Sequence, residues 1–232
     1  MYVDTQYQNE SSKGLWDLVV GQRTSSTSVG KATWLEGINS PQTDRWPFIS
    51  ADSLTLVFAS DRGRPGKSRI FLSRRSTTSV PFGPAQEISG LPPGSLQSPY
   101  LRGNELWFQG PDGNGDIYWS TLTNGMAGPA TPVSELNYAA TPEISPVVTP
   151  EGLLAFWASA NHETDGGPPS GRSDFDIWLG TRGSLDESFY VRKVTELNSE
   201  SNEWPTWISP DGCRLYFISK REGAQFVYVA SR

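Results

Sequence analysis

The chain has 232 residues, a formal net charge of −6 at pH 7, one cysteine and one histidine. The acidic balance argues against a nucleic-acid partner, because proteins that bind the phosphate backbone present a basic face. One cysteine excludes an intramolecular disulfide, and one histidine excludes the familiar histidine-rich metal sites. No apolar run is long enough to cross a bilayer and the first 20 residues lack the pattern of a signal peptide, so no membrane span is expected.

The composition favours many short strands joined by tight turns. Glycine occurs 23 times, proline 18 times and tryptophan nine times. Glycine and proline set turn dihedrals, while large rings fill the wedge-shaped spaces between sheets. Helix-periodic stretches are absent, so the sequence predicts an all-β protein.

Five short apolar segments of similar pattern recur along the chain every 47 to 60 residues. They lie at 16–20, 69–73, 116–120, 176–180 and 226–230. This period is the length of one four-stranded unit with its turns and indicates propeller blades. We therefore expect a β-propeller of five four-stranded blades, with four blades as a poorer fit, forming a single domain over 1–232.

In chain order, the repeat units cover about 2–40, 46–90, 98–136, 142–197 and 204–232. The three middle units each predict an inner strand with proline at its start, a turn, two apolar strands and a more polar outer strand. The first unit lacks an inner strand and the last lacks an outer one. Residues 2–8 are expected either to form a hairpin with 16–20 or to complete the last blade as its outer strand.

The Pro-Asp-Gly turn at 210–212, the aromatic strand after it and the Asp-Ile-Trp strand at 176–178 resemble the TolB-type (WD40-like) β-propeller repeat. The resemblance covers nearly the whole chain, although Ser53 replaces the turn glycine in one blade. In that family these positions mostly serve turns and packing between blades. The resemblance favours an extracytoplasmic compartment, periplasmic or secreted. It implies no single function, because the family includes interaction domains, periplasmic scaffolds and modules appended to enzymes.

The loops at one end of a propeller surround the axial opening, where ligands usually bind. Rings, carboxylates and guanidinium groups there suit a polar ligand such as a peptide or a sugar. The alternative is that they are ordinary solvated charges and blade-start rings. The residues predicted to bind the ligand are Asp44, Arg45, Trp46, Asp61, Arg62, His162, Glu203, Trp204 and Arg221.

Oxygen-bearing side chains alternate at Asp112, Asn114 and Asp116, the spacing by which a loop wraps calcium. A calcium loop needs about six oxygens, and no acidic residue follows where the helix-loop-helix version has its bidentate glutamate. A plain Asn-Gly turn explains the same letters. Calcium is thus the one metal considered, and no other cofactor is expected.

His162 lies within the longest departure from the repeat, the Gly/Pro/Ser-rich stretch 161–173. As a catalytic base it would need a nucleophile and an orienting acid, and the sequence has no recognisable signature for them. The remaining enzymatic alternative is a glycoside hydrolase that uses two or three axial acids. Its candidate acids are Asp44, Asp61, Glu143 and Glu203.

Together these patterns favour a non-enzymatic module that recognises a protein, peptide or other polar ligand at the axial loop face. The alternative is a carbohydrate-binding or glycoside-hydrolase-type propeller that uses the axial carboxylates and tryptophans. A third, structural alternative applies if the chain is a fragment. Unpaired blade edges would then promote dimerisation or strand exchange.

Overall fold

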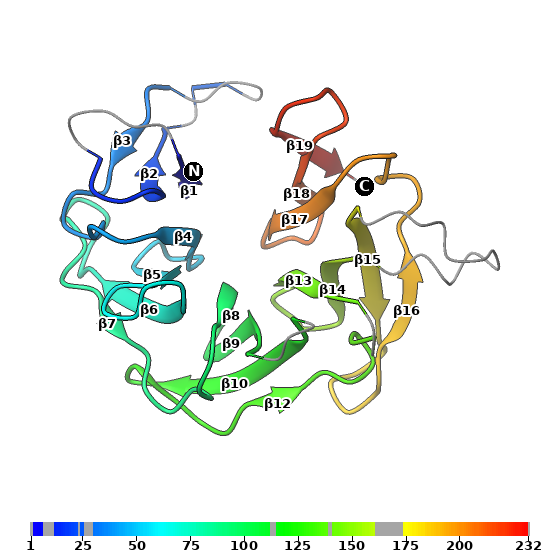
Figure 1. Cartoon of the computed structure of the whole chain (residues 1–232). Helices are drawn as coiled ribbons and strands as arrows, with labels where there is room; N and C mark the ends of the chain where they lie inside the picture. Colours follow the sequence, from blue (N-terminus) through cyan, green and yellow to red (C-terminus); the bar gives the residue numbers. More distant parts are fainter. Residues whose placement is uncertain are drawn as a thin grey trace.

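The computed structural model describes residues 2–6, 12–22, 24–25, 30–111, 115–138, 141–160 and 174–231. Within these ranges every regular element is a β-strand, and the strands form five small antiparallel sheets arranged radially around one axis (Figure 1). The expectation of an all-β propeller with five blades is confirmed. None of the described residues belongs to a helix that could span a membrane.

The blades follow one another in chain order. Blade 1 contains β1 (Tyr2–Thr5), β2 (Asp17–Val20) and β3 (Thr33–Trp34). Blade 2 contains β4 (Asp44–Ile49), β5 (Thr55–Ser60), β6 (Arg69–Arg74) and β7 (Gln86–Glu87). Blade 3 contains β8 (Gln97–Arg102), β9 (Glu105–Gln109), β10 (Ile117–Thr123) and β12 (Thr131–Pro132), with β11 (Met126–Ala127) also paired to β10.

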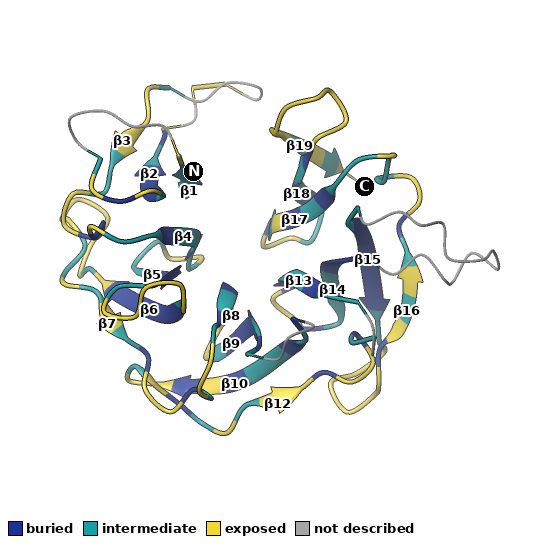
Figure 2. Ribbon diagram, viewed as in Figure 1, coloured by how far each residue is buried: buried dark blue, intermediate teal, exposed yellow. Residues whose placement is uncertain are grey.

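Blade 4 contains β13 (Glu143–Val148), β14 (Leu154–Ser159), β15 (Asp176–Thr181) and β16 (Tyr190–Lys193). Blade 5 contains β17 (Glu203–Ile208), β18 (Arg214–Ser219) and β19 (Phe226–Ser231). Figure 2 shows that the buried residues lie mainly on the three inner strands of blades 2 to 4, while the short outer strands β3, β7, β12 and β16 are largely exposed. This distribution agrees with the polar sequences of the outer strands.

The two terminal blades are incomplete, each in a different way. β1 pairs with β2 in antiparallel register, from Tyr2 opposite Val20 to Thr5 opposite Asp17. Of the two alternatives for the N-terminal strand, the hairpin is therefore the one that forms. Neighbouring inner elements pack in the series β1, β4, β8, β13 and β17, whereas the ribbons of blades 1 and 5 stand apart (Figure 1). Among the described residues, blade 1 therefore has no inner strand, blade 5 has no outer strand, and no strand joins the two blades.

Each of the four inner strands carries a β-bulge, which explains its proline. In three of them a residue with left-handed backbone precedes the proline: Trp46 (φ 50°), Ser98 (φ 47°) and Ser145 (φ 55°). The strands begin two or three residues earlier than these prolines, so each lies at the bulge rather than at the strand start. Pro142, which was predicted to start the inner strand of blade 4, directly precedes β13. A bulge leaves a residue outside the ladder, which accommodates a residue that has no N–H to donate.

A pair of aromatic rings lies between the second and third strands of blades 2 to 5. These stacked pairs are Phe58 with Phe71, Phe108 with Tyr118, Trp157 with Trp178, and Phe217 with Tyr228. Phe58 and Phe71 form a buried cluster with Leu18 of the preceding blade. At the same register positions blade 1 has Val3 opposite Val19. Blade 1 therefore has two valines at the position where each of the other blades has a pair of aromatic rings.

Candidate functional site

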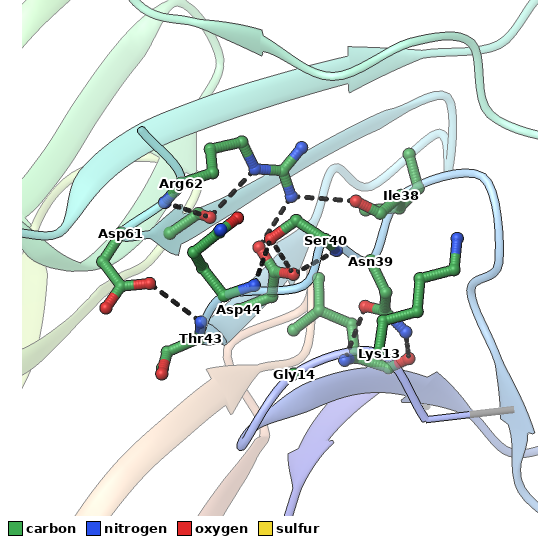
Figure 3. A network of polar contacts seen from close by, with 12 residues as sticks. Lys13, Gly14, Ile38, Asn39, Ser40, Thr43, Asp44, Asp61 and Arg62 are labelled. Carbon is green, nitrogen blue, oxygen red and sulfur yellow. Dashed lines mark hydrogen bonds and ion pairs between the residues drawn. The ribbon is translucent and has the colours of Figure 1, made fainter. Parts of the chain in front are cut away.

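A buried ion pair holds the loop end of blade 2 (Figure 3). The Asp44 carboxylate is fully buried and accepts hydrogen bonds from the backbone N–H and hydroxyl of Ser40, at 2.6 and 2.9 Å. The Arg62 Nη2 lies 2.6 Å from the Asp44 Oδ1 and also donates to the carbonyl of Ile38. Arg62 Nε donates to the hydroxyl of Ser60 at 2.9 Å. We call this acid, hydroxyl and arginine arrangement the loop brace.

Blade 5 repeats the loop brace with a glutamate. Glu203 is fully buried and accepts hydrogen bonds from the backbone N–H and hydroxyl of Ser199 and from the hydroxyl of Ser219. Arg221 Nε donates to Ser219 at 2.8 Å, while its Nη2 lies 3.6 Å from Glu203 and donates to the carbonyl of Leu197. Arg62 and Arg221 therefore have equivalent positions and the same partners.

Blades 3 and 4 modify the loop brace. The acid in blade 4 is Glu143, fully buried and bonded to the N–H of Tyr138 and the hydroxyls of Thr141 and Ser159. Burial raises the pKa of Glu143 to about 7, and the charge of Asp116 adds to this increase, against the effect of its hydrogen bonds. By register, the acid and hydroxyl positions of blade 3 are occupied by Leu96 and Gly110.

Three of the four acids considered for hydrolysis are therefore buried at the starts of inner strands in different blades. The fourth, Asp61, accepts from the N–H groups of Thr43 and Gly66 at 2.8 and 3.1 Å. Each of these carboxylates is bonded to its own loops. By accepting hydrogen bonds from backbone N–H groups, these carboxylates hold the loops between blades in place.

A cation stacked on two tryptophans lies, partly exposed, on the inner strand β4 of blade 2. The Arg45 guanidinium lies 4.0 Å from the ring centroid of Trp16 and 4.3 Å from that of Trp46. Its Nε also donates to the Asp4 carboxylate at 2.9 Å, and 30% of its side chain is exposed. Because blade 1 has no inner strand, blade 2 meets β1 directly here, which places Asp4 against Arg45. We call Trp16, Arg45 and Trp46 the tryptophan clamp.

Trp204 occupies the inner-strand position of blade 5 that Arg45 occupies in blade 2, by their register with Ile218 and Ala59. The Lys220 ammonium lies 5.9 Å from the Trp204 ring centroid. The predicted ring positions Trp46 and Trp204 thus each have a cation near one face. Such cation–π contacts hold a ring and a charge in a fixed relation.

Some of the predicted site residues lie outside the described residues. These are His162, Asp112 and Asn114. Asp116 is described, and its backbone carbonyl accepts the N–H of Gly110 at 2.7 Å. Over the described ranges no three acidic, histidine or cysteine side chains gather as a metal site would require. The calcium interpretation stays a prediction.

A surface pocket of about 380 Å³ lies at the opposite end of the molecule, between blades 3 and 4. Its walls include Trp107, Phe189 and two arginines, Arg102 and Arg182. Arg102 is held by Glu105 through Nε and Nη2. Burial, followed by the charge of Arg102, lowers the pKa of Arg182. Sequence analysis did not predict this pocket because it depends on the packing of two blades.

A repeated asparagine that was not predicted from the sequence bonds the third strand in three blades. In three blades the side-chain amide accepts from the backbone N–H and donates to the carbonyl of one residue, at 2.7–3.1 Å. The pairs are Asn39 with Leu18, Asn137 with Ile117, and Asn198 with Ile177. The sequence carries a five-residue pattern for it at 35–39, 133–137 and 194–198. The pattern is a branched aliphatic residue, then any two residues, then either Leu or Ile, and finally Asn. We call this arrangement the asparagine clasp.

No protein-family model matches the chain, and no curated protein matches it at a significant level. Among solved structures, it is similar to TolB from Acinetobacter baumannii, with a TM-score of 0.56 and 14% identity over 93% of this chain and 46% of that one. It is also similar to a putative TolB from Agrobacterium tumefaciens, with a TM-score of 0.54 and 20% identity over 79% of this chain and 59% of that one. The chain therefore spans about half the length of these structures, and the likeness shows a TolB-type β-propeller fold.

Proposed function

We propose that this TolB-type β-propeller is a non-enzymatic binding module that recognises a protein or peptide at its axial loop face, in an extracytoplasmic compartment. The observation that carries the proposal is the tryptophan clamp. Arg45 lies between two half-buried rings with part of its charge exposed. Tryptophan and arginine held rigidly beside each other are typical of the residues that contribute most to protein interfaces.

The state of the acids supports a binding role over hydrolysis. Glycoside hydrolysis needs two carboxyl groups that face one substrate bond. Asp44, Glu143 and Glu203 are each fully buried among hydrogen-bond donors of their own blade. These contacts account for the three acids as structural groups.

The tryptophan rings also favour a peptide over a sugar. A sugar ring binds on the open face of an aromatic side chain, whereas the guanidinium of Arg45 lies over one face of both Trp16 and Trp46. A guanidinium with part of its charge exposed instead suits a carboxylate or backbone carbonyl of a peptide. We therefore expect a peptide that presents an acidic side chain beside an apolar one.

The proposal is tested with a randomised peptide library displayed on phage and, in parallel, a glycan array. Enriched peptides should lose at least tenfold in affinity for Trp46→Ala and for Arg45→Lys, since lysine keeps the charge but not the planar stacking. The matched control is Tyr190→Ala, on an outer strand where the ring is 74% exposed. Peptides that bind all variants equally, or glycans that bind in place of peptides, would overturn the proposal.

A further inference from the structure

The free edge of blade 5 has properties that the other blade edges lack. Sheet order places β19 at the edge of blade 5, paired only with β18 among the described strands. Its sequence, Phe-Val-Tyr-Val-Ala-Ser, contains neither charge nor proline. Phe226, Val227 and Val229 are 48%, 44% and 50% exposed. Natural edge strands are usually protected by charges, prolines or short length, so an unprotected apolar edge indicates a surface made for pairing.

Every other blade of the chain covers its third strand with an outer strand. β3 covers β2, β7 covers β6, β12 covers β10, and β16 covers β15. In three of these blades the asparagine clasp comes directly after the outer strand. The first residue of its pattern donates its backbone N–H to the third-strand carbonyl that the asparagine also bonds. These bonds run from Leu35 to Leu18, from Val133 to Ile117 and from Val194 to Ile177, at 3.0–3.1 Å. The chain therefore has one repeated chemistry for covering a third strand.

The register identifies the residue of β19 that this chemistry would reach. Ile177 lies opposite Ala158 in blade 4, and Val227 lies opposite Ile218 in blade 5, one position inside the end of each ladder. The N–H and carbonyl of Ile177 point outward to the asparagine clasp. The N–H and carbonyl of Val227 accordingly point away from β18, toward the position of an outer strand.

Blade 1 does not supply the missing strand. Its β1 is already paired with β2, and the register position at which the other blades have stacked rings holds Val3 and Val19. The ribbons of blades 1 and 5 are separated (Figure 1). Among the described residues, blade 1 therefore offers blade 5 neither an unpaired strand nor the pair of aromatic rings found in blades 2 to 5.

We propose that β19 accepts an outer strand from a polypeptide segment outside residues 1–232. The donated segment is extended and carries the five-residue pattern of the asparagine clasp. This pattern is a branched aliphatic residue, any two residues, either Leu or Ile, and then Asn. Its backbone pairs with β19, and its asparagine bonds the N–H and carbonyl of Val227. This is strand addition to a sheet edge, in which main-chain bonds give affinity and individual side chains give selectivity. The site lies on the blade edge and is separate from the tryptophan clamp, so it extends the proposed function.

The test uses the full chain and a fluorescein-labelled synthetic peptide with the sequence of residues 190–198, which holds β16 and its asparagine. The peptide should bind with saturable anisotropy, and its Asn198→Ala form should bind about tenfold more weakly because one side chain makes both clasp bonds. Val227→Pro removes one outward donor and should reduce binding by a similar factor or more. Val227→Thr keeps the backbone donor and β-branched shape and should bind as the wild type does.

A second measurement separates binding from folding. Far-UV circular dichroism and the thermal midpoint of Val227→Pro should remain close to those of Val227→Thr, because the ladder to β18 does not use that N–H. Equal binding of the parent and Asn198→Ala peptides would overturn the proposal, as would no binding to the wild type. Sedimentation that showed a dimer abolished by Val227→Pro would also overturn it, because a second copy would then occupy the edge.

Discussion

Arg62 and Asp44 form an ion pair with an N–O distance of 2.6 Å, in which the Asp44 carboxylate is fully buried and the Arg62 side chain is 22% exposed. The same arginine holds the carbonyl of Ile38, which lies in the connection from blade 1. One side chain therefore joins the start of an inner strand, the loop between second and third strands, and the connection between two blades. The loop brace is a link between blades as well as within one.

Removal of this arginine should be costly. Arg62→Ala leaves the buried Asp44 carboxylate without its cation, and we expect the free energy of unfolding to fall by about 3 kcal/mol. Arg221→Ala should cost less, because its Nη2 lies 3.6 Å from Glu203 and its side chain is 31% exposed. Urea unfolding followed by tryptophan fluorescence measures both.

The control for the loop brace is Arg192→Ala, which removes an exposed ion pair of 3.6 Å and should change stability by less than about 1 kcal/mol. A rescue is also expected. Adding Asp44→Leu and Ser60→Gly to Arg62→Ala copies Leu96 and Gly110 of blade 3 and should recover part of the loss. An Arg62→Ala protein as stable as the Arg192→Ala protein would show that the buried pair contributes nothing.

Glu143 should make the protein less stable at neutral pH than at mildly acidic pH. Its pKa is about 7 in the folded protein against an ordinary 4.5. Below pH 4.5 the group is protonated in both states. Between pH 4.5 and 7 the unfolded chain releases the proton first, so stability falls, and above pH 7 the full loss of about 3 kcal/mol is present.

The measurement is the difference in unfolding free energy between the wild type and Glu143→Gln at pH 4.5, 6 and 8. The other ionisable groups contribute to both proteins and cancel in this difference. We expect the variant to gain stability relative to the wild type as the pH rises. A difference that stays constant over this range would refute the raised pKa.

The asparagine clasp should contribute equally wherever it occurs. Asn198→Ala removes a donor and an acceptor that serve the N–H and carbonyl of Ile177 at 2.7 and 3.0 Å. The N–H of Ile177 loses its partner, while its carbonyl keeps only the N–H of Val194, and this loss should cost about 2 kcal/mol in unfolding free energy. Asn39→Ala and Asn137→Ala should give similar losses in thermal and urea unfolding. The idea fails if one of the three proves neutral.

Ser53 should be improved by glycine. It adopts a left-handed backbone (φ 60°) at the hairpin position where blades 4 and 5 have Gly152 and Gly212. Ser53→Gly should therefore raise the free energy of unfolding by about 0.5–1 kcal/mol. The matched control is Gly103→Ser, since a Cβ there meets no atom within 4 Å and only the φ of 59° opposes it. Calorimetry should show opposite shifts in thermal midpoint for the two variants.

The repeat period predicted the blades because each blade must present apolar residues at the same strand positions. Segments such as 69–73 and 176–180 show this directly, and both are third strands in the structure. Pro47, Pro99 and Pro205 were assigned to strand starts but lie two or three residues after the first residue of the strand, whereas Pro142 directly precedes β13. Positive φ at Trp46 and Ser98 creates bulges that shift the ladder, and a bulge has no simple letter pattern apart from its proline.

The placement of Asp44, Arg62, Glu203 and Arg221 at one end of the ring could be predicted, because loop ends follow from strand order. Their bonding could not, since an acid at a strand start looks the same in sequence whether it faces solvent or a neighbouring serine and arginine. The stacking of Arg45 on two rings depends on the missing inner strand of blade 1 in the same way. Ligand binding by these residues stays a prediction.

The separation of blades 1 and 5 makes this molecule a one-dimensional array bent into an arc. In a closed propeller every blade has two neighbours, whereas among the described strands the two end blades pack closely against one blade each. When stability is a sum of blade terms and nearest-neighbour terms, the ends of such an array open first. Amide exchange should therefore be slowest in β9 and β10 of the central blade and fastest in β1 and β19. A strand bound at β19 would then slow exchange from the C-terminal end inward.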